Sequence, residues 1–138
     1  MEKRWLFVLI FLETDVLFEL LNKKSSKGDV IFQKLEKSNE SFAITSITFY
    51  EIVSFFMLRG RIVPPINLLQ GFGFSKEDAQ KAAELELTLQ NKGKKKIMMT
   101  DLITAAIVMN KGGSLCALND RFEELKELGL KLFLVWLY

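Results

Sequence analysis

The chain has 138 residues, of which 49% are hydrophobic and 12 are Phe, so it carries enough apolar side chains for a full core. This composition excludes a mostly disordered chain, and the length predicts one domain over residues 1–138. The formal net charge is only +2, from 19 basic and 17 acidic residues, which by itself does not indicate nucleic-acid binding.

The lack of histidine in the sequence excludes whole classes of site. Ser-His-Asp and Cys-His nucleophile systems need an imidazole, and the usual zinc and iron sites also use one. Cys116 is the single cysteine, so no internal disulfide can form, and its apolar neighbours favour a small buried strand residue. We therefore expect a reducing compartment, the cytoplasm.

The predicted elements begin with an apolar segment, residues 5–12, that follows a basic start as in a signal peptide. The segment is eight residues long, Glu13 ends it, and no small-residue cleavage site follows. It is too short to cross a bilayer, so we expect no membrane association. Because its β-branched and aromatic residues do not alternate with polar ones, it predicts a strand that is covered on both faces.

Helical and strand patterns then follow each other along the chain. In order, the sequence predicts helices at 15–24 and 29–38, a strand at 41–46, a helix at 47–59, a short helix at 66–71, a loop at 71–74, helices at 75–93 and 100–113, a strand at 114–118, a helix at 119–129 and a strand at 130–136. The clearest helix starts after Ser75, an N-cap with Asp78 three residues on. Strands separated by helices predict an α/β fold in which helices cover both faces of a mostly parallel sheet.

Acidic or amide side chains follow the apolar segments at four places. These residues are Glu13 and Asp15, Glu51, Asp101, and the pair Asn119 and Asp120. In open parallel sheets, sites form beyond the carboxyl ends of the strands. Gathered there, carboxylates could hold one or two Mg²⁺ or Mn²⁺ ions, because hard cations prefer oxygen ligands and clustered like charges repel each other without a cation.

A structural interpretation stands beside the metal site, because helix starts generally attract acids. Each acid could be a helix cap, singly or in a capping box: Thr48 with Glu51, Asp120 with Glu123, Asp101 and Asp15. The residue pattern alone leaves both interpretations open.

Three segments carry a resemblance to a known family. They are "FLETDVLFELL", "ITSITFYEIVS" and "MTDLITAAIVMNKGGSLCALNDRF", and the third is the most specific. In their order and flanking residues the chain resembles the PIN-domain nucleases, particularly the VapC-type toxins of prokaryotic toxin–antitoxin pairs. The resemblance covers nearly the whole chain.

The resemblance implies a three-layer α/β/α sandwich, PIN-like, with a four-acid pocket that binds Mg²⁺ or Mn²⁺ and hydrolyses RNA phosphodiester bonds. By position, the catalytic residues would be Glu13, Glu51, Asp101 and Asn119, and the metal ligands Glu13, Glu51, Asp101 and Asp120. Thr14, Ser46 and Arg121 would lie near the substrate. The implied partners are an RNA substrate, a small antitoxin protein and a second copy in a homodimer.

Two sites depart from the family pattern. Glu13 stands where the family has Asp, and its extra methylene moves the carboxylate by more than about 1 Å, although Mg²⁺ demands near-ideal octahedral geometry. Ala117 replaces a Thr, and Asn119 supplies a neutral oxygen at the fourth acid position. An alternative function is therefore a PIN-fold protein whose impaired pocket serves as a binding or regulatory module. An unrelated α/β domain whose acids are only caps is a third interpretation.

The chemical hypothesis for an active pocket is metal-assisted hydrolysis, in which the ion lowers the pKa of a bound water and stabilises the developing charge. Basic residues that would attract the RNA backbone are Lys23, Lys24, Lys27, Arg59, Arg61, Lys92 and the run 94–96, although a solvated loop explains "NKGKKK" more simply. Apolar residues beyond the needs of the core would bind the partners that the resemblance implies, unless some of them belong to the core: Phe55, Phe56, Met57, Phe72 and Phe74.

Overall fold

The computed structural model describes residues 9–94 and 96–133, and these build a five-stranded sheet in the order β3-β2-β1-β4-β5. All four neighbouring pairs are parallel, as the sequence predicts. The strands are β1 (Leu9–Leu12), β2 (Ser41–Thr45), β3 (Gln70–Phe72), β4 (Ser114–Cys116) and β5 (Lys131–Leu132). Parts of the strands predicted at 5–12 and 130–136 lie outside the described residues.

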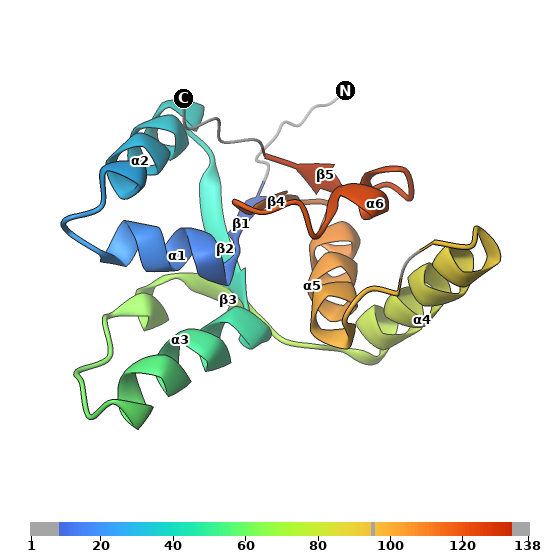
Figure 1. The fold of residues 1–138 in the computed structure, drawn as a ribbon, viewed down its shortest axis with the longest axis horizontal. Coiled ribbons are helices and arrows are strands. Elements are labelled where there is room, and N and C mark those ends of the chain that lie inside the picture. The colour runs from blue at the N-terminus through green and yellow to red at the C-terminus, as the bar shows by residue number, and fades with distance from the viewer. Residues whose placement is uncertain (1–8, 95, 134–138) are drawn as a thin grey trace, which may run out of the picture.

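Helices lie on both sides of the sheet, which gives three layers (Figure 1). On one side are α1 (Thr14–Leu21), α2 (Ser26–Ser38) and α3 (Ser46–Leu58). On the other are α4 (Lys76–Asn91), α5 (Met99–Asn110) and the short α6 (Glu123–Lys126). A 3-10 turn, Ile66–Leu68, precedes β3. The predicted α/β/α sandwich is therefore confirmed.

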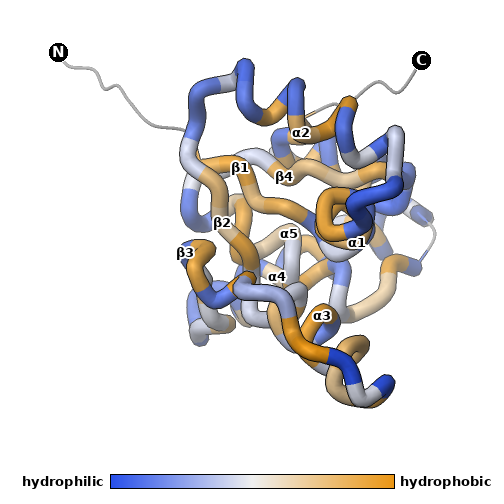
Figure 2. Tube along the Cα trace, turned by 90° about the vertical axis from the view of Figure 1, so that its left-hand side faces the viewer, coloured by the Kyte–Doolittle hydropathy of each residue, from blue (hydrophilic) through white to orange (hydrophobic). Residues whose placement is uncertain are grey.

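The central strand β1 explains the two cores. Its side chains point alternately to the two faces, so Ile10 and Leu12 pack with α1–α3 while Phe11 packs with α4–α6. All three are buried, and Figure 2 shows β1 running through the apolar interior. A strand covered on both faces has no polar side, which is why residues 9–12 do not alternate in hydropathy.

Three element predictions are wrong in part. Residues 71–74 were predicted as a loop, yet β3 pairs with β2 there, with Phe72 opposite Thr45. Gly71 and Gly73 have low strand propensity, so the sequence does not indicate this edge strand. The helix predicted at 119–129 shrinks to α6, since the chain before it turns to place Asn119 and Phe122. The helix predicted at 29–38 begins at Ser26.

The predicted caps also change. Thr45, and not Thr48, caps α3 by accepting a hydrogen bond from the Thr48 backbone, so the box of Thr48 with Glu51 is wrong. The box of Asp120 with Glu123 is wrong too, because α6 has no side-chain cap. These corrections leave Glu51 and Asp120 without a capping role.

The capping box of α4 is confirmed. The Ser75 hydroxyl accepts from the Asp78 backbone at 3.1 Å, and the Asp78 carboxylate accepts from the Ser75 backbone at 3.0 Å. Asn110 of α5 donates to the same carboxylate at 2.8 Å, which ties the two helices together. Burial raises the pKa of Asp78, but the hydrogen bonds from Ser75 and Asn110 outweigh it, and the pKa lies below its ordinary value.

Asp78→Ala is expected to lower the free energy of unfolding by about 2 kcal/mol, because it removes the cap and leaves the Ser75 N–H and the Asn110 amide without a partner. Since the folded pKa is lowered, this stabilisation is present above pH 3.8 and lost as the pH falls through the folded pKa. Urea denaturation would measure both effects. Glu86→Ala, at an exposed position on the same helix, is the control and should change stability by less than about 0.5 kcal/mol.

Candidate active site

A cavity of about 240 Å³ opens where β1 and β2 end and α5 begins. Its charged lining consists of four carboxylates and one guanidinium among the described residues: Glu13, Asp15, Glu51, Asp101 and Arg121. Three of the acids that the sequence nominated are thus brought together with Arg121 from a fourth segment. The rest of the lining comprises Thr14, Phe18, Ile47, Met98, Thr100 and Thr104.

Glu13 is the N-cap of α1 and is only 4% exposed. Its Oε1 accepts from the Thr14 backbone at 3.0 Å and from the Thr48 hydroxyl at 3.3 Å, and its Oε2 is paired with Arg121. Burial dominates and raises the pKa of Glu13; the Thr14 hydrogen bond and the Arg121 charge oppose the rise without cancelling it. The carboxylate is therefore held by protein partners on both oxygens.

Asp101 lies in the first turn of α5 and is 8% exposed. Its Oδ2 is 3.5 Å from the Nε of Arg121. Burial raises the pKa of Asp101, and the nearby charges of Glu51 and Asp15 add to the rise, against the guanidinium of Arg121. The neighbouring carboxylates therefore make Asp101 harder to ionise than an isolated aspartate.

Asp15 has a different role from the helix cap that the sequence favoured. One of its oxygens accepts from the Leu118 backbone at 3.1 Å and from the Asn119 amide at 2.7 Å. It therefore fixes the loop after β4 against the start of α1. Glu13 caps the helix instead, and both side chains line the cavity.

Glu51, on the second turn of α3, faces Thr14 across the cavity. The Thr14 hydroxyl donates a hydrogen bond to Glu51 Oε1. This contact links the acid that follows β2 with the residue that follows Glu13, so the two predicted segments meet as expected from parallel strands that end at one edge.

The other predicted site residues lie around this cavity. Asn119 binds Asp15 and accepts from the Arg121 backbone at 3.0 Å. Asp120 lines an adjoining cavity of about 340 Å³ beside Arg121. The Ser46 hydroxyl donates to the Phe72 carbonyl at 3.2 Å, toward the edge strand, and is not part of the cavity lining.

The donors are chemically suited to a hard cation, but their arrangement does not fit one. Among the described residues, no group of three or more acidic or cysteine side chains is placed to hold a metal ion. Arg121 lies against both Glu13 and Asp101. The acids share a cavity without forming a ligand set.

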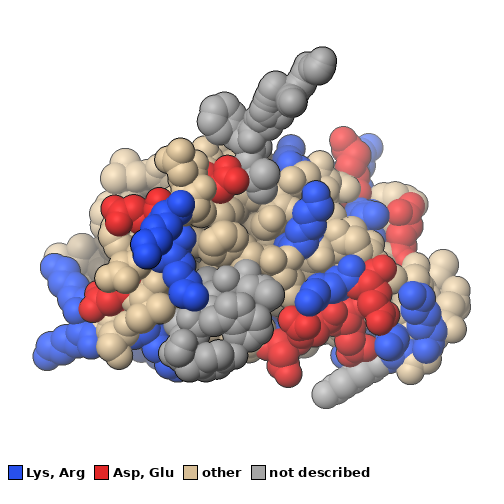
Figure 3. All heavy atoms as spheres, turned by 90° about the horizontal axis from the view of Figure 1, so that it is seen from above, with Lys and Arg blue, Asp and Glu red and all other residues tan. Residues whose placement is uncertain are grey.

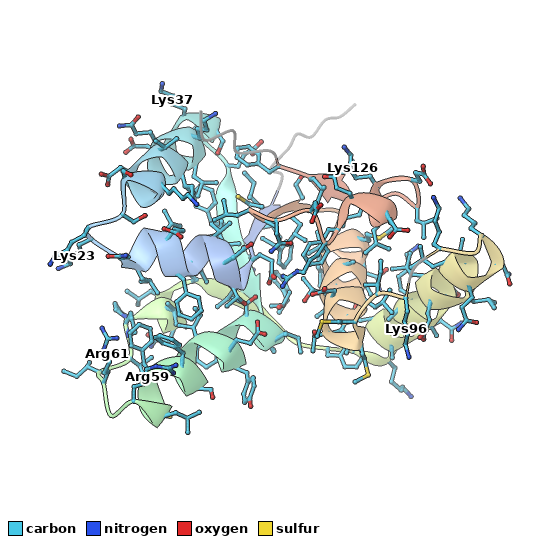
Figure 4. The ribbon with its side chains drawn as sticks, viewed as in Figure 1. Lys23, Lys37, Arg59, Arg61, Lys96 and Lys126 are labelled. Carbon is cyan, nitrogen blue, oxygen red and sulfur yellow. The ribbon has the colours of Figure 1, made fainter. Side chains whose placement is uncertain are left out.

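Basic side chains are dispersed over the surface. The labelled ones come from different parts of the chain in Figure 4, with Arg59 and Arg61 close together beyond α3, and acidic and basic groups intermingle on the face seen in Figure 3. Arg59 and Arg61 stack on the rings of Phe55 and Phe56, at 3.8 and 5.2 Å from the ring centroids. Of the described basic residues nominated for RNA, Lys96 lines the adjoining cavity next to Arg121.

Sequence reasoning missed part of the lining, including Met98 and Thr104. It listed Asp15 among the acids after the first strand but left it out of the predicted catalytic and metal-binding residues. Thr104 lies one helical turn after Thr100 and so shares its face of α5, but only the packed helix shows which face meets the acids.

Three solved structures show how closely the fold is shared. A chain of VapBC2 from Rickettsia felis, bound to a promoter DNA fragment, is 22% identical, with a TM-score of 0.72 over 91% of this chain and 98% of that one. FitAcB from Neisseria gonorrhoeae is 16% identical, with a TM-score of 0.72 over 92% of this chain and 98% of that one. VapBC-5 from Mycobacterium tuberculosis is 14% identical, with a TM-score of 0.66 over 94% of this chain and 99% of that one.

The chain has the fold of these three structures, of which VapBC-5 belongs to a family of toxin–antitoxin systems. The three-layer α/β/α sandwich that the resemblance implied is thereby confirmed. No protein-family model and no curated protein matches the sequence. Among the described helices, none is long and apolar enough to cross a membrane.

Proposed function

We propose that the protein is an endoribonuclease that depends on Mg²⁺ or Mn²⁺ and acts as the toxin of a toxin–antitoxin pair. The observation that carries this proposal is the cavity itself. Within a fold shared with toxin–antitoxin complexes, four carboxylates from three segments converge with an arginine beyond the ends of β1 and β2.

The cavity contains oxygen donors of the type that the proposed cation prefers and two groups that could contact a phosphate. Carboxylates repel a phosphodiester, so RNA can approach these acids only if positive charge stands between them. Glu51, Asp101 and Glu13 supply hard oxygen donors, and Asp15 adds a fourth carboxylate. Thr14 and Arg121 are the hydroxyl and guanidinium that could contact phosphate.

The proposed partners are a small antitoxin and a second copy of the chain, in the cytoplasm. Support comes from the fold neighbours, which are toxin–antitoxin complexes, and from exposed apolar side chains. Of the five nominated apolar residues, Phe56 is buried while Met57 and Phe74 are 65% and 48% exposed. Near Met57, Leu58 and Ile62 are 81% and 92% exposed, so the end of α3 carries more apolar surface than the sequence suggested.

The test is RNA cleavage by the purified chain with Mn²⁺, with Mg²⁺ and with EDTA. We expect cleavage that EDTA abolishes and that Glu51→Gln lowers about a hundredfold, because the substitution removes a charge from the cavity and keeps the shape. Glu86→Gln, an exposed acid on α4, is the matched control and should cleave like the wild type.

A second function, a binding or regulatory module with an impaired pocket, is favoured by the contacts of Glu13. Both of its oxygens are already engaged, by Thr14, Thr48 and Arg121. RNA binding without cleavage, in the presence of either cation, would establish this function and contradict the nuclease.

A further inference from the structure

Arg121 is placed where a cation would be needed. Its Nη2 pairs with Glu13 Oε2, and its Nε lies 3.5 Å from Asp101 Oδ2. These two acids come from the end of β1 and the start of α5, so the guanidinium bridges the two sides of the cavity. Both acids are at least nine-tenths buried, and one positive charge offsets part of their repulsion.

The backbone of Arg121 is fixed, whereas its side chain, although paired with Glu13 and Asp101, is partly exposed. The Arg121 N–H donates to Asn119 Oδ1 at 3.0 Å, and Asn119 in turn binds Asp15, so the loop is fixed. The side chain is 43% exposed, whereas the Glu13 side chain is 5% exposed. The guanidinium can therefore move without displacing the loop.

The adjoining cavity could accept the Arg121 side chain if it left Glu13 and Asp101. The adjoining cavity of about 340 Å³ is also lined by Arg121, and it contains Asp120 and Glu124. These carboxylates offer new partners to a guanidinium that leaves Glu13 and Asp101. Arg121 and Asp101 line both cavities, so the two spaces adjoin at the guanidinium.

We propose that Arg121 is the resident counter-cation of the acidic pocket and that a divalent cation can bind only when this arginine swings away. The inference rests on the proposed function, which requires the cation. Two positive groups cannot share Glu13 and Asp101, since like charges at contact distance repel strongly in a partly buried site. This accounts for acids that line one cavity without forming a ligand set.

The experiment is titration of the full chain with Mn²⁺ by calorimetry, in four forms. Arg121→Gln should bind Mn²⁺ at least about tenfold more tightly than the wild type, because the competing charge is gone. Arg121→Lys keeps the charge and should stay within about threefold of the wild type. Lys126→Gln removes a charge from the exposed ion pair with Glu123 and should leave the affinity unchanged.

A second measurement uses the wild type alone, so it does not depend on how the variants fold. The Nε–H of Arg121 is followed by NMR during titration with Mg²⁺. We expect its protection from hydrogen exchange to fall as the cation binds, with a change in its chemical shift. Cation binding that leaves the Arg121 Nε–H protected and unshifted would overturn the inference.

The outcomes separate this inference from the proposed function. If the wild type binds Mn²⁺ and Arg121→Gln binds it equally or more weakly, the proposed role of Arg121 is overturned, but the proposed cation-dependent nuclease is not contradicted. Binding by neither form overturns both. If Arg121→Gln and Lys126→Gln both bind Mn²⁺ more tightly, the change in net charge explains the effect, and the proposed role of Arg121 is overturned.

Discussion

Asp101→Asn is expected to lower cation-dependent RNA cleavage by about a hundredfold or more while leaving the fold at least as stable as the wild type. The amide keeps the size of the carboxylate and removes its charge. Because burial raises the pKa of Asp101, the folded state holds the ionised form less well than the unfolded chain does. Activity and stability should therefore change in opposite directions.

The sign of the pH dependence follows from the raised pKa. A carboxyl with a raised folded pKa stabilises the protein most below its ordinary value of 3.8, and that stabilisation is lost as the pH rises through the folded pKa. As the pH rises from 3.8 through the folded pKa of Asp101, the free energy of unfolding of the wild type should fall relative to that of Asp101→Asn, and above the folded pKa the difference should stay constant.

Urea denaturation from pH 3 to 8 and a cleavage assay on the same preparations measure both effects. Glu86→Gln is a suitable control, since Glu86 is an exposed acid on α4 that lines neither cavity. Full cleavage by Asp101→Asn would exclude this carboxylate from the reaction. A large loss of stability at neutral pH would instead make its ion pair with Arg121 structural.

Gly113→Ala is expected to destabilise the fold by about 3 kcal/mol, the upper end of the usual cost of overpacking. An added Cβ would lie 2.8 Å from the Leu9 carbonyl oxygen and 2.8 Å from the ring of Phe11. Leu9 and Phe11 belong to the central strand, and Phe11 is 1% exposed and packs on Phe72, so neither can give way cheaply.

Gly71→Ala provides the control for Gly113→Ala. Gly71 lies in the edge strand β3, and a Cβ there would meet no atom within 4 Å. Its substitution should change stability by less than about 0.5 kcal/mol. Equal losses in the two variants, measured by urea denaturation, would show that backbone freedom and not the close approach to β1 explains the glycine.

Local signals were sufficient for much of the fold. The apolar run at 9–12 predicts a strand covered on both faces, and Ser75 with Asp78 predicts the start of α4, because each depends on residues close in the chain. The edge strand β3 could not be predicted in this way. Its pairing with β2 supplies what its glycines lack in propensity.

The same division holds for the site. The sequence alone predicts the parallel α/β architecture and nominates Glu13, Glu51 and Asp101 as acids that could gather in one site, while it leaves helix caps as the other interpretation. Only the tertiary structure decided that Glu13 caps α1, that Asp15 fixes the loop at Asn119 and that Arg121 lies between two acids. The contacts of Asp15 with Asn119 and of Glu13 with Arg121 join residues 104 and 108 positions apart, and no local pattern specifies which partners a buried charge will find.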